Sequence, residues 1–152
     1  NDPLLDDGKP DLPVSIDCLA WPMPAHRSVS STFKDPKHPF VPGKHDGTDF
    51  PAPVGTPVLA VADGEVEWTR EVAPGQDAAV SIRFDQTWFF EVHHLSRVEV
   101  AKGATVARGQ PLGLSGGAVG AAGSGPWTTG PPLHFSLRHG QAYVNVAKYF
   151  CP

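Results

Sequence analysis

Two segments of the sequence carry side chains that could bind one metal ion. In KHDGTDF, His45 and Asp49 are four residues apart around Gly47, so a turn at the glycine would bring an imidazole and a carboxylate together. Neutral imidazole nitrogens and carboxylate oxygens are ordinary zinc ligands. In LHFSLR, the alternation of a strand places the apolar residues on one face and His134 on the other, toward an open groove.

A set of two histidines and one carboxylate leaves the fourth tetrahedral position of a zinc ion to water. This coordination is typical of a catalytic zinc site and not of a closed structural one. The same ligand types also hold non-haem iron, but the H-x-x-x-D spacing of His45 and Asp49 differs from the H-x-D spacing usual there. Taken alone, each segment also fits a simpler interpretation, a solvated turn or a hydrogen-bonded histidine at a sheet edge.

Two adjacent histidines in FFEVHHLS offer acid–base chemistry. In a strand, His94 shares a face with Phe90 and Val92, and His93 lies on the reverse. We therefore expect only one of the two to act as a general base or hydrogen-bond donor. The alternation of the strand alone does not say which of the two histidines acts.

The residue two positions before His134 is Pro132, which would share its face in a strand. Proline has no titratable group and no backbone N–H, so it can neither exchange a proton nor donate a hydrogen bond there. No other histidine is an evident replacement. Parity excludes His93 and His139 from the face of His134. His26 and His38 lie in loop-like segments and could reach the groove, but nothing in the sequence requires it, and we interpret His38, in KHPF, as a solvated loop residue.

Short strands must position these side chains. Glycine (16) and proline (17) are frequent and spread along the chain, which favours turns and short strands over long helices. In AVSIRF, Val80, Ile82 and Phe84 share one face, the pattern of a half-buried strand. We expect strands at residues 28–33, 57–61, 64–68, 79–84, 88–95 and 133–138, and a turn near 146–150.

These elements predict one all-β domain, with a small antiparallel sheet as its core and long loops that form a groove. A chain of 152 residues is long enough for one domain with a real core and too short for two. Prolines block regular structure near the start, so we assign residues 1–21 to an N-terminal arm and 22–152 to the domain.

A glycine-rich segment at 113–132 stands apart, because seven of its twenty residues are glycine. Such a segment cannot bury enough apolar surface to order itself, and we expect a long loop. It is either a flexible connector or a binding element. Trp127 in its middle favours a contact with the core or with a ligand.

Composition excludes several classes of function. A net charge of −4 and a pI of 5.9 give no basic surface for nucleic acid, and no apolar run of 18 residues could span a membrane. Cys18 and Cys151 lie near opposite ends. A disulfide between them would stabilise the fold by about 5 kcal/mol through loop entropy and would indicate an oxidising compartment outside the cytoplasm. Two buried free thiols are the alternative.

Taken in order, these motifs resemble the lysostaphin-type (LytM-like, M23) zinc metallopeptidases. VSSTF and HDGTDFPAPVGTPVLAVADGEV are similar to the opening of that family, with its H-x-x-x-D ligands. VHHLSRVEVAKGATVARGQPLGLSG is similar to its His-Leu strand and the Gly-Gln run that follows, and TTGPPLHFSL lies at the place of its Thr-Gly-Pro-His-Leu-His-Phe signature. The resemblance covers about residues 22–145.

The resemblance implies one Zn²⁺ ion bound by His45, Asp49 and His134, with His94 as a catalytic histidine. It also implies hydrolysis of peptides in bacterial peptidoglycan. We expect the protein to be a monomer and to be periplasmic or secreted. Pro132 stands where the family has the first histidine of its His-x-His motif. Two functions therefore remain open: a zinc endopeptidase, attenuated at this position, or a non-catalytic zinc-binding module that binds cell-wall peptide or regulates another hydrolase.

Overall fold

The structure is a computed structural model that describes residues 4–6, 8–128, 130 and 132–152. Within these residues there is no α-helix, so the all-β prediction is confirmed. The strands are β1 (Thr48–Pro51), β2 (Pro57–Leu59), β3 (Gly64–Arg70), β4 (Ala79–Arg83), β5 (Trp88–His93), β6 (Leu95–Val98), β7 (Thr105–Val106), β8 (Pro111–Ser115), β9 (Pro132–His139) and β10 (Ala142–Val144). A short 3₁₀ helix, η1 (Val146–Lys148), follows them.

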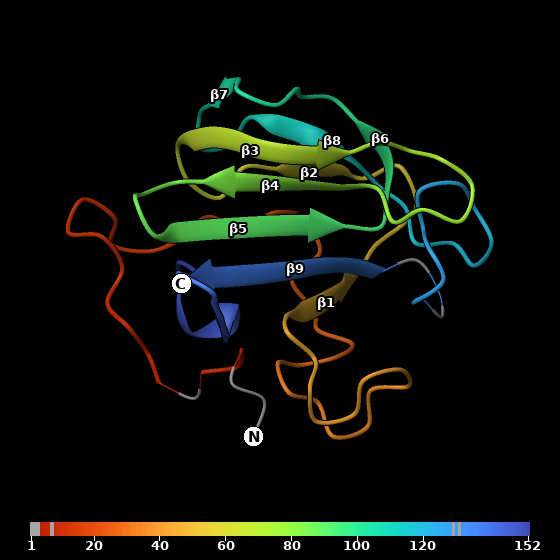
Figure 1. The fold of residues 1–152 in the computed structure, drawn as a ribbon, viewed down its shortest axis with the longest axis horizontal. Helices are drawn as coiled ribbons and strands as arrows, with labels where there is room; N and C mark the ends of the chain where they lie inside the picture. The colour runs from red at the N-terminus through yellow and green to blue at the C-terminus, as the bar shows by residue number, and fades with distance from the viewer. Residues whose placement is uncertain (1–3, 7, 129, 131) are drawn as a thin grey trace.

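The strands form two antiparallel sheets (Figure 1). In the larger sheet the order is β1-β9-β5-β4-β3-β7, and β10 pairs with the second half of β9. The smaller sheet has the order β2-β8-β6. Val58 and Leu112 of the smaller sheet belong to the same buried cluster as Val66 and Ile82 of the larger one. One apolar core therefore supports both sheets.

Strands β5 and β9 lie side by side at the centre of the larger sheet, and their two faces differ in chemistry. On the core face, the fully buried rings of Phe90 and Phe135 stack with their centroids 5.7 Å apart. On the other face, His93 lies directly opposite His134 in the register of the two strands. Side chains alternate along a strand, so the apolar face anchors the sheet while the polar face presents histidines.

Two of the expected strands differ from the structure. The prediction for 28–33 is wrong, because within this range only Ser31 forms an isolated bridge, to Asp49 of β1. The single strand expected at 88–95 is divided into β5 and β6 by His94, whose φ of 64° lies in the left-handed region. This conformation is uncommon outside glycine and turns the chain out of the plane of the sheet. The turn near 146–150 is present as η1.

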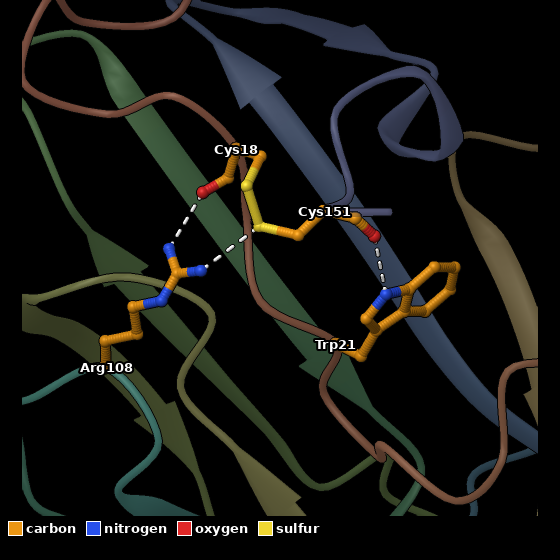
Figure 2. Close-up of a disulfide and its surroundings, with 4 residues drawn as sticks. All are labelled: Cys18, Trp21, Arg108 and Cys151. Atoms are coloured by element: carbon orange, nitrogen blue, oxygen red, sulfur yellow. Dashed lines mark hydrogen bonds between the residues drawn. A yellow bond between two sulfur atoms is a disulfide. The ribbon is translucent and has the colours of Figure 1, made fainter.

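A disulfide joins Cys18 and Cys151, as expected, with their Cα atoms 4.9 Å apart. Figure 2 shows the contacts around it. The guanidinium of Arg108 donates to the carbonyl oxygen of Cys18 and to Sγ of Cys151, and the indole N–H of Trp21 donates to the carbonyl oxygen of Cys151. The N-terminal segment is thereby attached to the C-terminal end. The boundary of the arm at residue 21 stays a prediction.

The glycine-rich segment agrees with the expected loop over most of its length. Its first residues, 113–115, complete β8, and its described residues between β8 and β9 form no strand. The described part of the chain contains no helix that could cross a lipid bilayer.

Candidate active site

An open cavity of about 620 Å³ lies where β1, β5 and β9 meet the loop before β1 and the glycine-rich loop. Its volume is in the usual range for small-ligand sites. Among its lining residues are the four predicted site residues, His45, Asp49, His94 and His134. The structure therefore brings together residues that are up to 89 positions apart in the chain, while their roles as ligands or catalysts stay predictions.

Pairing between β1 and β9 sets the floor of this cavity, because Asp49 lies opposite His134 in the register. Gly47 makes the close approach feasible. A Cβ atom at this position would lie 2.9 Å from Cε1 of His134 and still closer to the backbone of Phe135. Real Cβ atoms do not come so close, so the turn that joins His45 to Asp49 requires glycine here.

Three potential ligand atoms converge on this floor. His45 Nε2 lies 3.3 Å from Asp49 Oδ1 and 3.1 Å from His134 Nδ1, and His134 Nδ1 lies 2.9 Å from the same carboxylate oxygen. His45 is almost fully buried, at 2% exposed. Its Nδ1–H donates to the carbonyl oxygen of Thr32 at 2.8 Å, which leaves the lone pair on Nε2.

His134 is oriented from its other nitrogen. Its Nε2–H lies 2.9 Å from Asp46 Oδ1 and 2.9 Å from Ser136 Oγ, so Nδ1 points to Asp49 and His45. A carboxylate behind a histidine in this way holds the ring and increases the basicity of the opposite nitrogen. Asp46, next to His45 in sequence, was not among the predicted site residues.

The carboxylates also govern the charge of this cluster in the metal-free protein. Burial tends to lower the pKa of His134, but hydrogen bonds to Asp46 and Asp49 outweigh it and raise the pKa to about 10. Burial tends to raise the pKa of Asp49, yet the hydrogen bonds from His134 and His45 hold it well below its usual value. A cation that binds here must therefore displace a proton from His134.

His38 also lines the cavity, contrary to the expectation that it is solvated. Its ring lies 4.3 Å from that of His45, between centroids. Three potential ligand atoms lie within 4.8 Å of one another, close enough to reach one cation: a ring nitrogen of His38, a ring nitrogen of His45 and a carboxylate oxygen of Asp49. Sequence parity could not find His38, because it lies in a loop.

His93 and His94 both line the cavity, and the prediction that His93 faces away from the site is wrong. The left-handed conformation of His94 is the reason: it returns the side chain to the cavity after His93 has already faced it. Asp77 holds the pair. Its Oδ2 accepts from His93 Nδ1–H at 2.7 Å, and its Oδ1 accepts from the backbone N–H of His94 at 2.7 Å.

The two adjacent histidines differ in their free nitrogens. Both nitrogens of His93 face carboxylates, Asp77 and Glu91, whose hydrogen bonds raise its pKa in spite of burial. His94 donates Nδ1–H to the carbonyl oxygen of Ser124 at 2.7 Å, and burial lowers its pKa. His94 is thus neutral at pH 7 with its lone pair on Nε2, as a general base requires, whereas His93 has no nitrogen left for a ligand.

The outer wall of the cavity is aromatic. Trp127 of the glycine-rich loop packs edge-to-face on Phe40 of the loop before β1, with ring centroids 5.5 Å apart. Trp127 is nevertheless 62% exposed. Its partner Phe40 lies in another loop and not in the core cluster, so the expected contact of Trp127 with a ligand stays a prediction.

Known peptidases are similar to this chain in sequence. The sequence pattern of peptidase family M23 matches residues 43–146. The peptidoglycan DD-endopeptidase ShyA of Vibrio cholerae is 38% identical over 138 residues, which are 87% of this chain and 30% of that protein. The glycyl-glycine endopeptidase ALE-1 of Staphylococcus capitis is 36% identical over 110 residues, which are 70% of this chain and 28% of that protein. The chain thus spans less than a third of either relative.

Solved structures agree with the sequence comparison. The crystal structure of a zinc-containing peptidase from Vibrio cholerae superposes with a TM-score of 0.72 at 34% identity, over 89% of this chain and 41% of that one. The catalytic domain of lysostaphin from Staphylococcus simulans, at 22% identity, shares the fold with a TM-score of 0.69, over 83% of this chain and 92% of that one. The family pattern covers more than half of the chain, which therefore belongs to peptidase family M23.

Proposed function

We propose that this chain is a zinc-dependent endopeptidase that hydrolyses peptides of bacterial peptidoglycan. The observation that carries the proposal is the convergence of His45 Nε2, Asp49 Oδ1 and His134 Nδ1 on the floor of an open cavity, each within 3.3 Å of the others. ShyA and ALE-1, which are named as a peptidoglycan DD-endopeptidase and a glycyl-glycine endopeptidase, support the class of substrate.

The three donor atoms suit a single zinc ion in type and spacing. Atoms bound tetrahedrally at about 2.0–2.1 Å from one zinc ion lie about 3.3 Å apart, and the three observed separations are 2.9, 3.1 and 3.3 Å. Two imidazoles and one carboxylate leave a position for water, as catalytic zinc sites do.

The proposed chemistry divides between the metal and His94. Bound zinc would polarise the scissile carbonyl and lower the pKa of a bound water. His94 would accept a proton from the attacking water at Nε2 and return it to the leaving amine. Its Nδ1–H bond to Ser124 holds the tautomer that this transfer needs. Asp77 is its positioning residue, through the backbone N–H of His94.

We further propose that the protein acts as a monomer outside the cytoplasm, in the periplasm or after secretion. The disulfide between Cys18 and Cys151 supports this location, since such bonds persist in oxidising compartments. Peptidoglycan also lies outside the cytoplasm.

The test is the digestion of purified peptidoglycan by zinc-loaded protein, scored by newly released amino termini. We expect release that is lost in His45→Ala and after chelation. Zinc content is measured in the same samples. A wild-type protein that holds one equivalent of zinc and releases no termini would contradict the proposal. It would favour a non-catalytic module, the alternative that Pro132 suggests.

A further inference from the structure

His38 lines the cavity, and its Nδ1 is hydrogen-bonded to two backbone N–H groups. We propose that His38 is a catalytic hydrogen-bond donor, which binds the developing negative charge on the scissile carbonyl oxygen, and is not a metal ligand. The inference rests on the proposed peptidase function for its substrate. The state of the His38 ring itself follows from the geometry alone.

Two backbone groups determine the tautomer of His38. The N–H groups of Phe40 and Val41 both point to its Nδ1, at 3.2 and 3.1 Å. A backbone N–H can only donate, so Nδ1 must offer its lone pair. A neutral imidazole carries one hydrogen, which therefore lies on Nε2.

His45 shows the opposite arrangement only seven residues later. Its Nδ1 faces a carbonyl oxygen, that of Thr32, which can only accept. His45 therefore carries its hydrogen on Nδ1 and its lone pair on Nε2, as a metal ligand must. For His38 to bind a metal through Nε2, Nδ1 would have to gain a hydrogen between two backbone donors. Of the two adjacent rings, His45 thus has the tautomer of a metal ligand and His38 that of a hydrogen-bond donor. Both rings nevertheless lie close enough to Asp49 for all three residues to reach one cation.

The Nε2–H of His38 has no acceptor within hydrogen-bond distance among the described residues. Asp49 Oδ2 is near but lies 3.9 Å away. The side chain is 10% exposed, at the wall of the cavity that Asp49 and Pro132 also line. A partly buried N–H that donates to none of the described residues, beside a candidate metal site, is what a site needs in order to stabilise an oxyanion.

This role would explain how the site tolerates Pro132. Proline can donate no hydrogen bond from the strand, and His38 offers a donor from the opposite loop without any change in the proposed ligands. No proton is transferred in this step. The hydrogen stays on Nε2 of His38, and its hydrogen bond to the carbonyl oxygen becomes stronger as negative charge develops on that oxygen.

Two substitutions separate the donor from the loop that carries it. In His38→Asn, the amide oxygen can take the place of Nδ1 and accept from Phe40 and Val41, so the loop is kept while the donor is removed. In His38→Gln, the longer side chain places an amide N–H near the former Nε2. We expect kcat to fall about 10²–10³-fold in the asparagine variant, with KM roughly unchanged, and to recover in part with glutamine.

Two readouts do not depend on activity. Zinc stoichiometry and affinity should be unchanged in His38→Asn, whereas His45→Ala should lose the ion. Long-range ¹H–¹⁵N spectra of zinc-loaded protein should show hydrogen on Nε2 and none on Nδ1 of His38, with the signals assigned by their loss in the asparagine variant.

Hydrogen on Nδ1, loss of zinc in His38→Asn, or an unchanged kcat would each overturn the proposal. A tenfold to hundredfold weaker affinity for zinc would also overturn it, since that is the effect of a residue that only supports a ligand. If the wild-type protein cleaved nothing, the proposed function would fail, and the spectra with the zinc titration would still decide between donor and ligand.

Discussion

The floor and the wall of the cavity are built in different ways. The floor, Asp49 on β1 and His134 on β9, is held by the ladder between two strands whose other face is packed in the core. The wall, His38, Phe40 and Trp127, lies on two loops and is held by local turns and contacts between rings. The floor is therefore rigid, because strand pairing and core packing both hold it. The wall can change with little cost to the fold, and it is where substrate specificity and rate can be adjusted.

The largest effect is expected on the floor. Replacement of His45 or Asp49 by alanine should abolish stoichiometric zinc binding and reduce peptidase activity to background, because two remaining ligands do not retain the ion against water. Metal content after desalting and release of amino termini measure the two effects. Lys44→Ala, at a neighbouring residue that also lines the cavity, is the matched control. Full zinc occupancy in either ligand variant would defeat the assignment.

This difference also explains how much could be predicted from the sequence. The alternation of apolar residues indicated β4, β5 and β9, because each has a core face, and strands were also expected at the places of β2 and β3. His45 and Asp49 could be proposed from their spacing around Gly47, and His134 from the alternation of its strand, although their ligand role awaits measurement. β1 was missed, since its four residues are too few to show a period.

What escaped prediction depends on local backbone geometry. The left-handed conformation of His94 is not visible in its residue type, so parity sent His93 to the wrong face. Asp77 and His38 lie in loops, where no period relates a residue to the site. Each is placed at the cavity by hydrogen bonds between residues that no sequence pattern relates.

A smaller effect should follow from weakening the support of the floor. Asp46→Asn removes the charge that accepts from Nε2–H of His134 but keeps a side chain of the same size. Affinity for zinc should fall about 10–100-fold, with binding still at one equivalent. Competition with a chelator of known affinity measures the change. An unchanged affinity would show that Ser136, which also lies 2.9 Å from Nε2, is sufficient.

Asp77 connects the strands to the glycine-rich loop, since it contacts His93 and forms bridges to Gly123 and Ser124. Burial tends to raise its pKa, but hydrogen bonding to His93 and the charges of the two histidines lower it to about 2 from 3.8. A depressed pKa stabilises the folded protein above the unfolded value, and this stabilisation is lost as pH falls through the folded value.

Asp77→Asn should therefore lower the free energy of unfolding of the zinc-free protein by about 2 kcal/mol between pH 5 and 7. The gap between variant and wild type should close as pH falls from about 4 to about 2. Urea denaturation across this range measures it. A gap that is independent of pH would mean that the carboxylate is not charged in the way described here.

The smallest effect is expected at the outer wall. Trp127→Ala removes the edge-to-face contact with Phe40, a type of interaction of about 0.5–1.5 kcal/mol. Because Trp127 is 62% exposed, thermal stability should change little, and zinc binding should be unaffected. If the wall holds the peptide, KM should rise less than about tenfold with kcat nearly constant. A fall in kcat with KM unchanged would instead place Trp127, like His38, in the transition-state machinery, and the outer wall could not then be changed without loss of rate.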